Sequence, residues 1–425
     1  MSKANTDPLP TEATLAFARS HLSDDPSRLL LSANRYPEVD MQAAVTQIEG
    51  QRTAQRKWPA LLRCPDFVYP PHLACEQSSS EATAAYKASL VSPCRRIADL
   101  TGGMGIDTFA LSAKAEEMHY VEQNESLCTL ATHNLEALRQ SDLHAGNTTV
   151  HHADCLSWLA TQPPFDLLLI DPARRNAAGR KVAAFADCSP DILTHLPLLL
   201  NSATTLMVKA SPMIDIDLAA SQLGCATEAH IVAVGGECRE VLFLCHAGQS
   251  APPLIHCVNL PAAYPAAPSA AAEPSVCPFT RAAEASAPFS IAPAASRYLH
   301  IPSAEVMKAG CFRLISSWFS IPKLAPSTHV YTSDQPLQHF PGRTFEVLQE
   351  VKLNRREVQQ LLPEGRAHVI TRNYPLAADQ LQRRLGLREG GDHYLIAATV
   401  GGHPCGFLCC LLAPENTENG KNSTI

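Results

Sequence analysis

The sequence Asp99-Leu-Thr-Gly-Gly-Met-Gly105 lies between an apolar run, Ile97–Leu100, and a helical pattern from Ile106 to Ala115. This order predicts a strand, a glycine turn and the start of a helix. Glycine has no Cβ, so a ligand can approach the backbone of the turn closely, and the first turn of a helix offers N–H groups without intrahelical partners. The layout is typical of a fold that binds a nucleotide-type cofactor.

Strands and helices alternate around this turn, from Arg95 to His246, which predicts a doubly wound parallel sheet. The expected strands are Ile97–Leu100, His119–Glu122, Thr148–His152, Asp166–Asp171, Thr205–Ala210, His230–Val234 and Val241–Cys245, and the clearest helices are Leu127–Arg139 and Asp191–Leu200. Only Gly235–Arg239 separates the last two strands, which is too short for a crossover. They must therefore form a hairpin, which places one antiparallel strand in an otherwise parallel sheet.

The region before the sheet is predicted to be helical. Between residues 11 and about 75, apolar residues such as Leu15, Ala18 and Leu22 recur at helical spacing. The sequence Ser78-Ser-Ser-Glu81 matches a capping box, with Ser78 as the N-cap and Glu81 as the third helical residue, and predicts a helix to about Leu90.

The region after the sheet is more varied. Residues 251 to about 300 are rich in Ala, Pro and Ser, which is consistent with a flexible linker or with a loop inside a small domain. From Tyr298 to about Leu412, interspersed helices and short strands predict one or two small α+β modules. The expected elements are helices at Ser303–Phe319 and Ala378–Leu385, and strands near Thr344–Val351, His368–Thr371, Tyr394–Val400 and Gly406–Leu412.

The composition is that of a globular protein without a strong charge bias. The 425 residues carry a net charge of −7, so binding of nucleic acid would need a local basic face. The 15 cysteines are scattered without Cys-x-x-Cys spacing, so we expect reduced thiols and no metal site. The first residues, MSKANTDPLP, lack an apolar segment, and no apolar run is long enough to span a membrane. We therefore expect a cytoplasmic protein without membrane contact.

Three acidic residues lie at the ends of the first three predicted strands: Asp99, Glu122 and Asp154. Ligands of open α/β sheets bind beyond the carboxyl ends of the strands. A carboxylate after the second strand can accept hydrogen bonds from both hydroxyls of a ribose, and one after the third strand can accept from the exocyclic amine of adenine. A single acid at a strand end is more often a helix cap or a surface residue, but three in register with a glycine turn favour a cofactor site.

The glycine turn departs from the dinucleotide pattern Gly-x-Gly-x-x-Gly, because Thr108 stands where the third glycine would be. Together with the terminal hairpin, the pattern resembles the class I S-adenosylmethionine-dependent methyltransferases over about residues 77–246. Thr101 replaces a glycine that is usual in that family, and Gly102 can supply the backbone freedom instead. The resemblance implies S-adenosylmethionine as the cofactor, bound by Asp99, Thr101, Gly102, Gly103, Gly105, Glu122 and Asp154.

A second motif, Asp171-Pro-Ala-Arg-Arg175, follows the fourth predicted strand. It resembles the loop with which nucleic-acid methyltransferases hold the acceptor nitrogen, although Arg174 replaces the aromatic residue that stacks on the base there. It also resembles the Asp-Pro-x-Arg of RNA 5-methyluridine enzymes, but Ala210 occupies the position of their nucleophilic cysteine. We therefore expect direct transfer to a nitrogen or oxygen, with Asp171, Pro172 and Arg174 as catalytic residues. A structural ion pair is the alternative role for Arg174 and Arg175.

Longer stretches throughout the chain resemble the bacterial THUMP-like-domain methyltransferases. They are Gln77–Lys87, Asp99–Gly103, Lys209–Met213, Met307–Gly310, Tyr331–Asp334, Phe340–Arg343 and Thr371–Pro375. The resemblance implies a helical domain at residues 1–75, a Rossmann-like class I methyltransferase domain at 76–248, a Pro/Ala-rich connection with a ferredoxin-like segment at 249–340, a THUMP-like α+β domain at 341–413 and a disordered tail at 414–425. THUMP domains bind structured RNA, commonly tRNA, so the resemblance also implies an RNA partner.

Local charge gives this expectation modest support. Between Arg343 and Arg388, nine basic residues stand against five acidic ones, and Tyr374 beside Arg372 could stack on a base. The basic residues are Arg343, Lys352, Arg355, Arg356, Arg366, Arg372, Arg383, Arg384 and Arg388. Ordinary surface charge is the alternative interpretation.

The sequence favours a methyltransferase that acts on a base nitrogen of structured RNA, such as tRNA or rRNA. Two alternatives remain: a methyltransferase for a protein or small molecule that docks through the C-terminal modules, and a non-catalytic protein that binds S-adenosylmethionine or RNA. Asp171 argues against the last alternative, because a pure binding protein has no need of an acid beside the sulfonium. The sequence predicts no particular oligomeric state.

Overall fold

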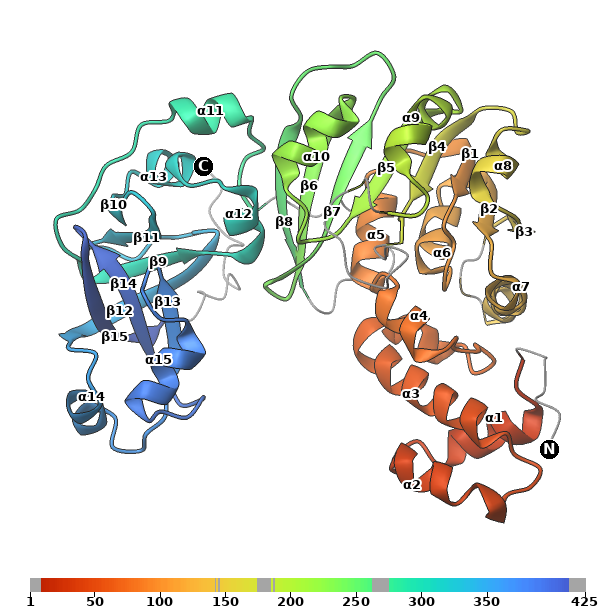
Figure 1. Cartoon of the computed structure of the whole chain (residues 1–425), viewed down its shortest axis with the longest axis horizontal. Helices are drawn as coiled ribbons and strands as arrows, with labels where there is room; N and C mark the ends of the chain where they lie inside the picture. Colours follow the sequence, from red (N-terminus) through yellow and green to blue (C-terminus); the bar gives the residue numbers. More distant parts are fainter. Residues whose placement is uncertain are drawn as a thin grey trace, which may run out of the picture. The chain divides into compact units, whose positions relative to one another are not determined.

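A computed structural model describes residues 9–141, 143, 146–173, 185, 188–261 and 275–412 (Figure 1). The chain divides into two compact units, Met1–Pro278 and Phe279–Ile425, and each is described by itself. The tail predicted at residues 414–425 lies outside the described residues. Within the described ranges, every helix is too short or too polar to cross a membrane.

The first unit begins with the expected helical region. Its elements are α1 (Glu12–Ser20), α2 (Pro26–Leu31), η1 (Ala33–Arg35), α3 (Met41–Lys57), η2 (Pro59–Arg63) and α4 (His72–Gln77). Trp58 and Phe67 from this region pack in one apolar cluster with Phe109 and Leu138 of the sheet domain that follows. The backbone N–H of Val68 donates to Asn134 Oδ1 at 2.8 Å, and Asn134 Nδ2 donates back to the Val68 carbonyl at 2.9 Å. Apolar packing and paired hydrogen bonds therefore join the helical region to the sheet domain.

The next helix, α5 (Glu81–Ser89), begins two residues later than the predicted capping box. Ser80 is its N-cap, and Ser80 and Thr83 cap each other's backbone N–H groups. The predicted roles of Ser78 as the N-cap and Glu81 as its partner are therefore wrong. Glu81 instead accepts a 2.9 Å hydrogen bond from the N–H of Ala60, because tertiary contact with η2 offers its carboxylate a donor outside the helix.

An eight-stranded sheet follows, with the order β3-β2-β1-β4-β5-β7-β6-β8. The strands are β1 (Cys94–Asp99), β2 (Ala115–Glu122), β3 (Thr148–His152), β4 (Phe165–Ile170), β5 (Ala203–Ala210), β6 (Ala226–Val234), β7 (Glu237–Cys245) and β8 (Leu254–Leu260), and the helices are α6 (Ile106–Ser112), α7 (Glu125–Gln140), α8 (Cys155–Leu159), α9 (Ile192–Asn201) and α10 (Ile216–Leu223). β1 to β5 pair in parallel, whereas β7 is antiparallel to both β5 and β6. The predicted doubly wound sheet and its hairpin are confirmed.

The last strand, β8, was not expected. It lies in the Ala/Pro/Ser-rich segment that was predicted as a linker or loop, and it pairs in parallel with β6 along seven residues, from Glu228↔Leu254 to Val234↔Leu260. The average composition of residues 251–300 conceals a short apolar stretch, in which Ile255, Cys257, Val258 and Leu260 are buried. β8 therefore extends the sheet beyond the predicted hairpin.

The second unit is built on one seven-stranded sheet, with the order β10-β11-β9-β12-β15-β14-β13. Its strands are β9 (Tyr298–Pro302), β10 (Lys323–Ala325), β11 (Thr328–Ser333), β12 (Gly342–Val351), β13 (His368–Arg372), β14 (His393–Val400) and β15 (His403–Leu411), and its helices are α11 (Arg281–Ser286), α12 (Ala304–Ala309), α13 (Arg313–Phe319), α14 (Arg355–Leu361) and α15 (Ala378–Leu385). The single helix predicted at Ser303–Phe319 is wrong, because Gly310 (φ +71°) ends α12 in a left-handed conformation.

Candidate active site

Asp99, the last residue of β1, stabilises the predicted cofactor loop that follows it. Only 2% of its surface is exposed. Its Oδ1 accepts a hydrogen bond from the N–H of Thr101 at 3.1 Å, and its Oδ2 accepts one from the Thr108 hydroxyl at 2.7 Å. Burial raises the pKa of Asp99 to about 7, against the opposing effect of the Thr108 hydrogen bond. Asp99 thus shapes the turn through its own hydrogen bonds.

Each glycine of the turn is needed for a different structural reason. A Cβ on Gly102 would lie 2.2 Å from the buried ring of Tyr120, so close packing excludes one. Gly103 (φ +55°) and Gly105 (φ +88°) adopt left-handed conformations that favour glycine. At Gly103 an added Cβ would meet only the Thr101 carbonyl oxygen, at 3.8 Å, so its backbone is open to a ligand. The Tyr120 hydroxyl fixes this residue by donating to the Gly103 carbonyl at 2.7 Å.

Glu122 and Asp154 lie at the carboxyl ends of β2 and β3, as predicted. Glu122 Oε2 accepts from the N–H of Gly103 at 3.1 Å, so this carboxylate is in direct contact with the glycine turn. Its Oε1 accepts from the N–H of Asn124 at 2.9 Å. Asp154 is exposed and caps α8, because its Oδ1 accepts from the N–H of Ser157 at 2.9 Å. The hydrogen bonds from Ser157 hold the pKa of Asp154 below its usual value.

Thr101 connects the glycine turn to the second predicted motif. Its hydroxyl oxygen accepts a 2.8 Å hydrogen bond from the backbone N–H of Asp171, directly after β4. The neighbouring Leu100 N–H donates to the Leu169 carbonyl at 2.9 Å. A glycine at position 101, as is usual in class I enzymes, could not accept this bond. Thr101 therefore fixes the backbone of the predicted catalytic Asp171.

The Asp171 carboxylate forms an ion pair with Lys209, the penultimate residue of β5, next to Ala210. Lys209 is almost fully buried, whereas 28% of the Asp171 side chain is exposed. Burial alone would lower the pKa of Lys209, but Asp171, Asp107 and Glu240 outweigh it and raise that pKa, so the amine stays charged. The Asp171 carboxylate thus contacts a buried, charged amine.

A second buried lysine extends this group of charges. Lys87 of α5 has no exposed side-chain surface, and its Nζ lies 2.6 Å from Glu240 Oε1 and 3.2 Å from Asp107 Oδ1. Ser79 also donates to Asp107, at 2.6 Å. The sequence stretches that contain Lys87 and Lys209 were noted only as parts of a family resemblance. A charged residue within an otherwise apolar stretch was the signal that could have identified both lysines. Their partners could not be identified in this way, because they lie far away in sequence.

Pro172 and Arg174 are the remaining predicted catalytic residues, and the structure describes only Pro172. Pro172 is buried beside Asp171, and Ala173 continues into a bridge with Ser189, whose carbonyl accepts from the Ala173 N–H at 2.7 Å. Arg174 and Arg175 lie outside the described residues. The predicted alternatives for Arg174, contact with substrate or a structural ion pair, therefore remain predictions.

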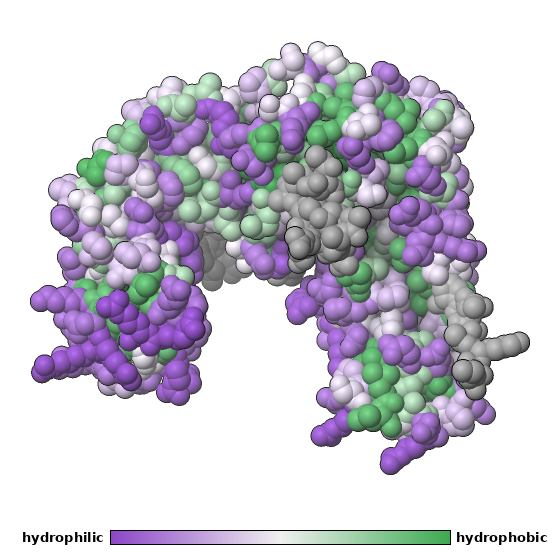
Figure 2. Space-filling model, in the orientation of Figure 1, coloured by the Kyte–Doolittle hydropathy of each residue, from purple (hydrophilic) through white to green (hydrophobic). Residues whose placement is uncertain are grey.

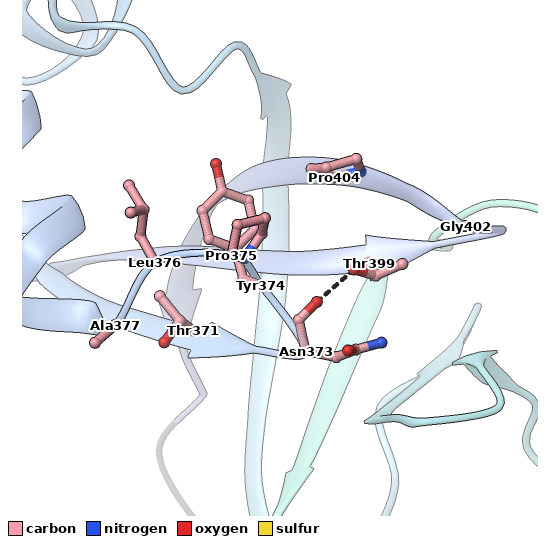
Figure 3. A pocket seen from close by; sticks show the side chains of 9 residues that line it. All are labelled: Thr371, Asn373, Tyr374, Pro375, Leu376, Ala377, Thr399, Gly402 and Pro404. Carbon is pink, nitrogen blue, oxygen red and sulfur yellow. Dashed lines mark hydrogen bonds between the residues drawn. The ribbon is translucent and has the colours of Figure 1, made fainter.

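The second unit contains an open cavity of about 660 Å³ near the loop between β13 and α15 (Figure 3). Asn373 turns the chain there in a left-handed conformation (φ +48°), and its carbonyl accepts a hydrogen bond from the Thr399 hydroxyl. The lining residues are Thr371, Asn373, Tyr374, Pro375, Leu376, Ala377, Thr399, Gly402 and Pro404. The predicted stacking residue Tyr374 thus lines a cavity, whereas Arg372 next to it is partly buried, and burial lowers its pKa.

Eight of the nine predicted basic residues are exposed, Arg372 being the exception. Of these eight, only Arg383 has an ion pair with another described residue, Asp379 at 2.5 Å. Strongly hydrophilic residues gather at the end of this unit that carries α14 and α15 (Figure 2). Most of the basic side chains there remain available for an external anion.

Comparison with known proteins agrees with this organisation. Residues 298–341 match the model of a ferredoxin-like domain family, and residues 342–410 match a THUMP domain-like family. The crystal structure of a protein named as a methyltransferase, from Porphyromonas gingivalis W83, is similar with a TM-score of 0.79 and 30% identity, covering 94% of this chain and 98% of that one.

Two proteins of Mycobacterium tuberculosis, from strains CDC 1551 and H37Rv, are each 25% identical over 360 residues, which cover 81% of this chain and 91% of theirs. Both are named uncharacterized S-adenosylmethionine-dependent methyltransferases. With the sheet, the glycine turn and both C-terminal matches in place, the chain belongs to the S-adenosylmethionine-dependent methyltransferases that carry ferredoxin-like and THUMP-like modules.

Proposed function

We propose that this enzyme transfers a methyl group from S-adenosylmethionine directly to a base nitrogen of structured RNA. The main support for this reaction is the position of Asp171 at the carboxyl end of the sheet. Its backbone N–H bonds to the Thr101 hydroxyl, and its carboxylate is paired with Lys209. The main support for RNA as the substrate is the THUMP domain-like match, together with the exposed basic residues of the same unit.

The residues around the glycine turn fit the cofactor. The open backbone at Gly103 can lie against the ligand, and Glu122 is placed to accept hydrogen bonds from ribose hydroxyls through lone pairs that its two backbone contacts leave unused. Asp154 is exposed at the next strand end and can accept from the adenine amine while capping α8. Asp99 and Thr101 act as positioning residues, because their hydrogen bonds are made within the protein.

When bound, S-adenosylmethionine supplies an electrophilic methyl group on a sulfonium. Asp171 holds the acceptor by accepting the hydrogen of its N–H, which directs the nitrogen lone pair towards that methyl group. The ammonium of Lys209 contacts the same carboxylate in a charge-assisted pair, which holds the Asp171 side chain in position. The proton released by the nitrogen passes to Asp171 or to water. Ala210 in place of a cysteine leaves the β5 end without a thiol nucleophile.

The exposed basic residues support RNA as the substrate. Arg355, Arg356 and Arg384 lie on α14 and α15 and can neutralise phosphates of a folded RNA. The cavity beside Tyr374 offers an aromatic ring on which an unpaired base can stack.

The test is to incubate the full chain with S-adenosylmethionine that carries a labelled methyl group, in separate reactions with total RNA and with protein extract. Both extracts come from a strain that lacks the gene, so that the substrate is unmethylated. We expect label in the RNA fraction. Label confined to protein or to small molecules would refute the RNA proposal, and absence of transfer despite cofactor binding would favour a non-catalytic role.

A further inference from the structure

A cluster of two histidines and one glutamate lies at the edge of the first unit's sheet where β8 pairs with β6. Glu228 and His230 are two residues apart on β6, so their side chains share one face of the sheet. His256 on β8 is the direct partner of His230 in the parallel register. The added strand thus completes a group of three side chains that neither strand could form alone.

The potential ligand atoms of this cluster converge. His230 Nε2 lies 3.0 Å from Glu228 Oε2, and His256 Nε2 lies 3.1 Å from the same oxygen. Two ligand atoms that are each about 2.1 Å from one Zn²⁺ ion are separated by roughly 3 to 3.5 Å. All three ligand atoms lie within 4.8 Å of one another. Throughout the described part of the chain, no other set of His, Cys, Asp and Glu side chains meets this condition.

A neighbouring hydroxyl fixes the His230 ring so that its Nε2 can bind a metal ion. Its other nitrogen, Nδ1, is 2.8 Å from the hydroxyl of Tyr86 on α5, and the contact is buried. Metal-binding histidines generally have such a partner on the second nitrogen, which fixes the ring and its tautomer.

The Nε2 atom of His256 is an independent indication that this cluster binds a ligand. The atom is buried, and no hydrogen bond with another described residue satisfies it, although Glu228 Oε2 is only 3.1 Å away. A buried polar atom without a hydrogen bond is costly, so a missing partner is expected at this position. Glu228 itself is 37% exposed and leaves a path from solvent.

We propose that Glu228, His230 and His256 bind a divalent transition-metal ion of the Zn²⁺ type. Two imidazole nitrogens and one carboxylate oxygen are suitable ligands for Zn²⁺, Co²⁺ and related ions, and water completes the coordination. The ion joins β8 to β6 and, through Tyr86, to α5. The site is distinct from the residues proposed for methyl transfer, and it differs from the sequence-based expectation of no metal site, which rested on cysteine spacing.

The first experiment measures the Zn²⁺ content of the full chain. The protein is stripped with a chelator, loaded with Zn²⁺, freed from excess metal by gel filtration and analysed by elemental mass spectrometry. We expect about one Zn²⁺ per wild-type chain and less than about a tenth of that in Glu228→Gln and His256→Gln. S-adenosylmethionine binding by each variant shows that it is folded.

His151→Gln is the matched control, because it changes a second, partly buried histidine pair of the same sheet. His119 Nδ1 and His151 Nε2 bond each other at 3.0 Å and do not converge on a carboxylate. This variant should retain the full Zn²⁺ content. Equal content in the wild type and both cluster variants, or none in the wild type, overturns the proposal.

Two further measurements need no change of a ligand. The Co²⁺ form should show visible bands without the thiolate-to-Co²⁺ charge transfer that cysteine ligands cause, and a strong thiolate band would place the metal elsewhere and overturn the proposal. Tyr86→Phe should weaken Zn²⁺ affinity roughly 10- to 100-fold, since it removes the partner of His230 Nδ1. Unchanged affinity would contradict ligation through His230 Nε2.

Discussion

The backbone N–H of Asp171 donates a 2.8 Å hydrogen bond to the side-chain hydroxyl of Thr101. This bond connects the cofactor turn after β1 to the predicted catalytic residue after β4. Thr101 also marks the departure of this chain from the usual glycine loop. The same residue therefore explains an irregular sequence motif and the placement of the acid that we propose holds the acceptor.

Removal of the Thr101 acceptor should reduce methyl transfer. Thr101→Val keeps the shape of the side chain but leaves the Asp171 N–H without its partner, which costs about 1–3 kcal/mol and displaces the carboxylate. We expect kcat/KM to fall roughly 10- to 100-fold. Thr101→Ser keeps the hydroxyl and should stay within about threefold of the wild type. Equal rates for Val and Ser would show that the bond does not position Asp171.

The buried Lys87 should be important for stability. Lys87→Met leaves Glu240 and Asp107 without the cation that both contact, and breaking such a buried pair typically costs about 3–5 kcal/mol. Arg19→Met is the matched control, because the Arg19–Glu12 pair of the same unit is exposed and should contribute no more than about 1 kcal/mol. Urea unfolding of both variants measures the difference. A similar small loss in both would contradict the role assigned to Lys87.

The raised pKa of Asp99 predicts a specific pH dependence of stability. In the folded protein this pKa is about 7, well above the ordinary value of 3.8, so the folded state binds the proton more tightly than the unfolded state. The contribution of Asp99 to the free energy of unfolding should therefore be greatest below about pH 4 and fall as the pH rises to about 7.

Asp99→Asn removes this titration and retains an acceptor for Thr101 and a donor towards Thr108. Relative to the variant, the wild type should lose at least about 1 kcal/mol between about pH 5 and pH 8 in urea unfolding. Asp154→Asn should show no such loss, because the lowered pKa of Asp154 places its titration below that range. A pH-independent difference between wild type and Asp99→Asn would refute the prediction.

The fold was predictable where local signals are strong. The glycine turn, the strand ends that carry Asp99, Glu122 and Asp171, and the hairpin of β6 and β7 follow from patterns within a few residues. The strand Thr148–His152 and the helix Ala378–Leu385 have their predicted bounds. Apolar periodicity and short connections leave few alternatives in these regions.

Contacts between distant residues were not predictable from the same patterns. The pairing of Lys87 with Glu240 joins residues 153 positions apart, and that of Lys209 with Asp171 joins residues 38 apart. Strand β8 was missed because the surrounding Ala/Pro-rich composition conceals it. The capping box was misplaced because Ser78, Ser79 and Ser80 offer three candidate caps, and in the fold Ser80 is the N-cap while Glu81 bonds to Ala60 of η2.

The basic residues of the second unit should control RNA affinity. Replacing Arg355 and Arg356 by Glu should weaken RNA binding and lower the salt dependence of its log Kd by about one unit for each lost phosphate contact. S-adenosylmethionine affinity should not change. The control is the same double replacement at Arg28 and Arg35, which are exposed in the first unit. If both double variants weaken binding equally, net charge and not this surface is responsible.

The central claim is methylation of a base nitrogen with Asp171 holding the acceptor. The most direct measurement is mass spectrometry of nucleosides from RNA treated with S-adenosylmethionine that carries a deuterated methyl group. Wild-type enzyme and Asp171→Asn are compared at equal cofactor occupancy. The account predicts a deuteromethyl group on a base nitrogen that the variant forms at least about 100-fold more slowly. A label on ribose or on a base carbon, or equal labelling by the variant, would contradict it.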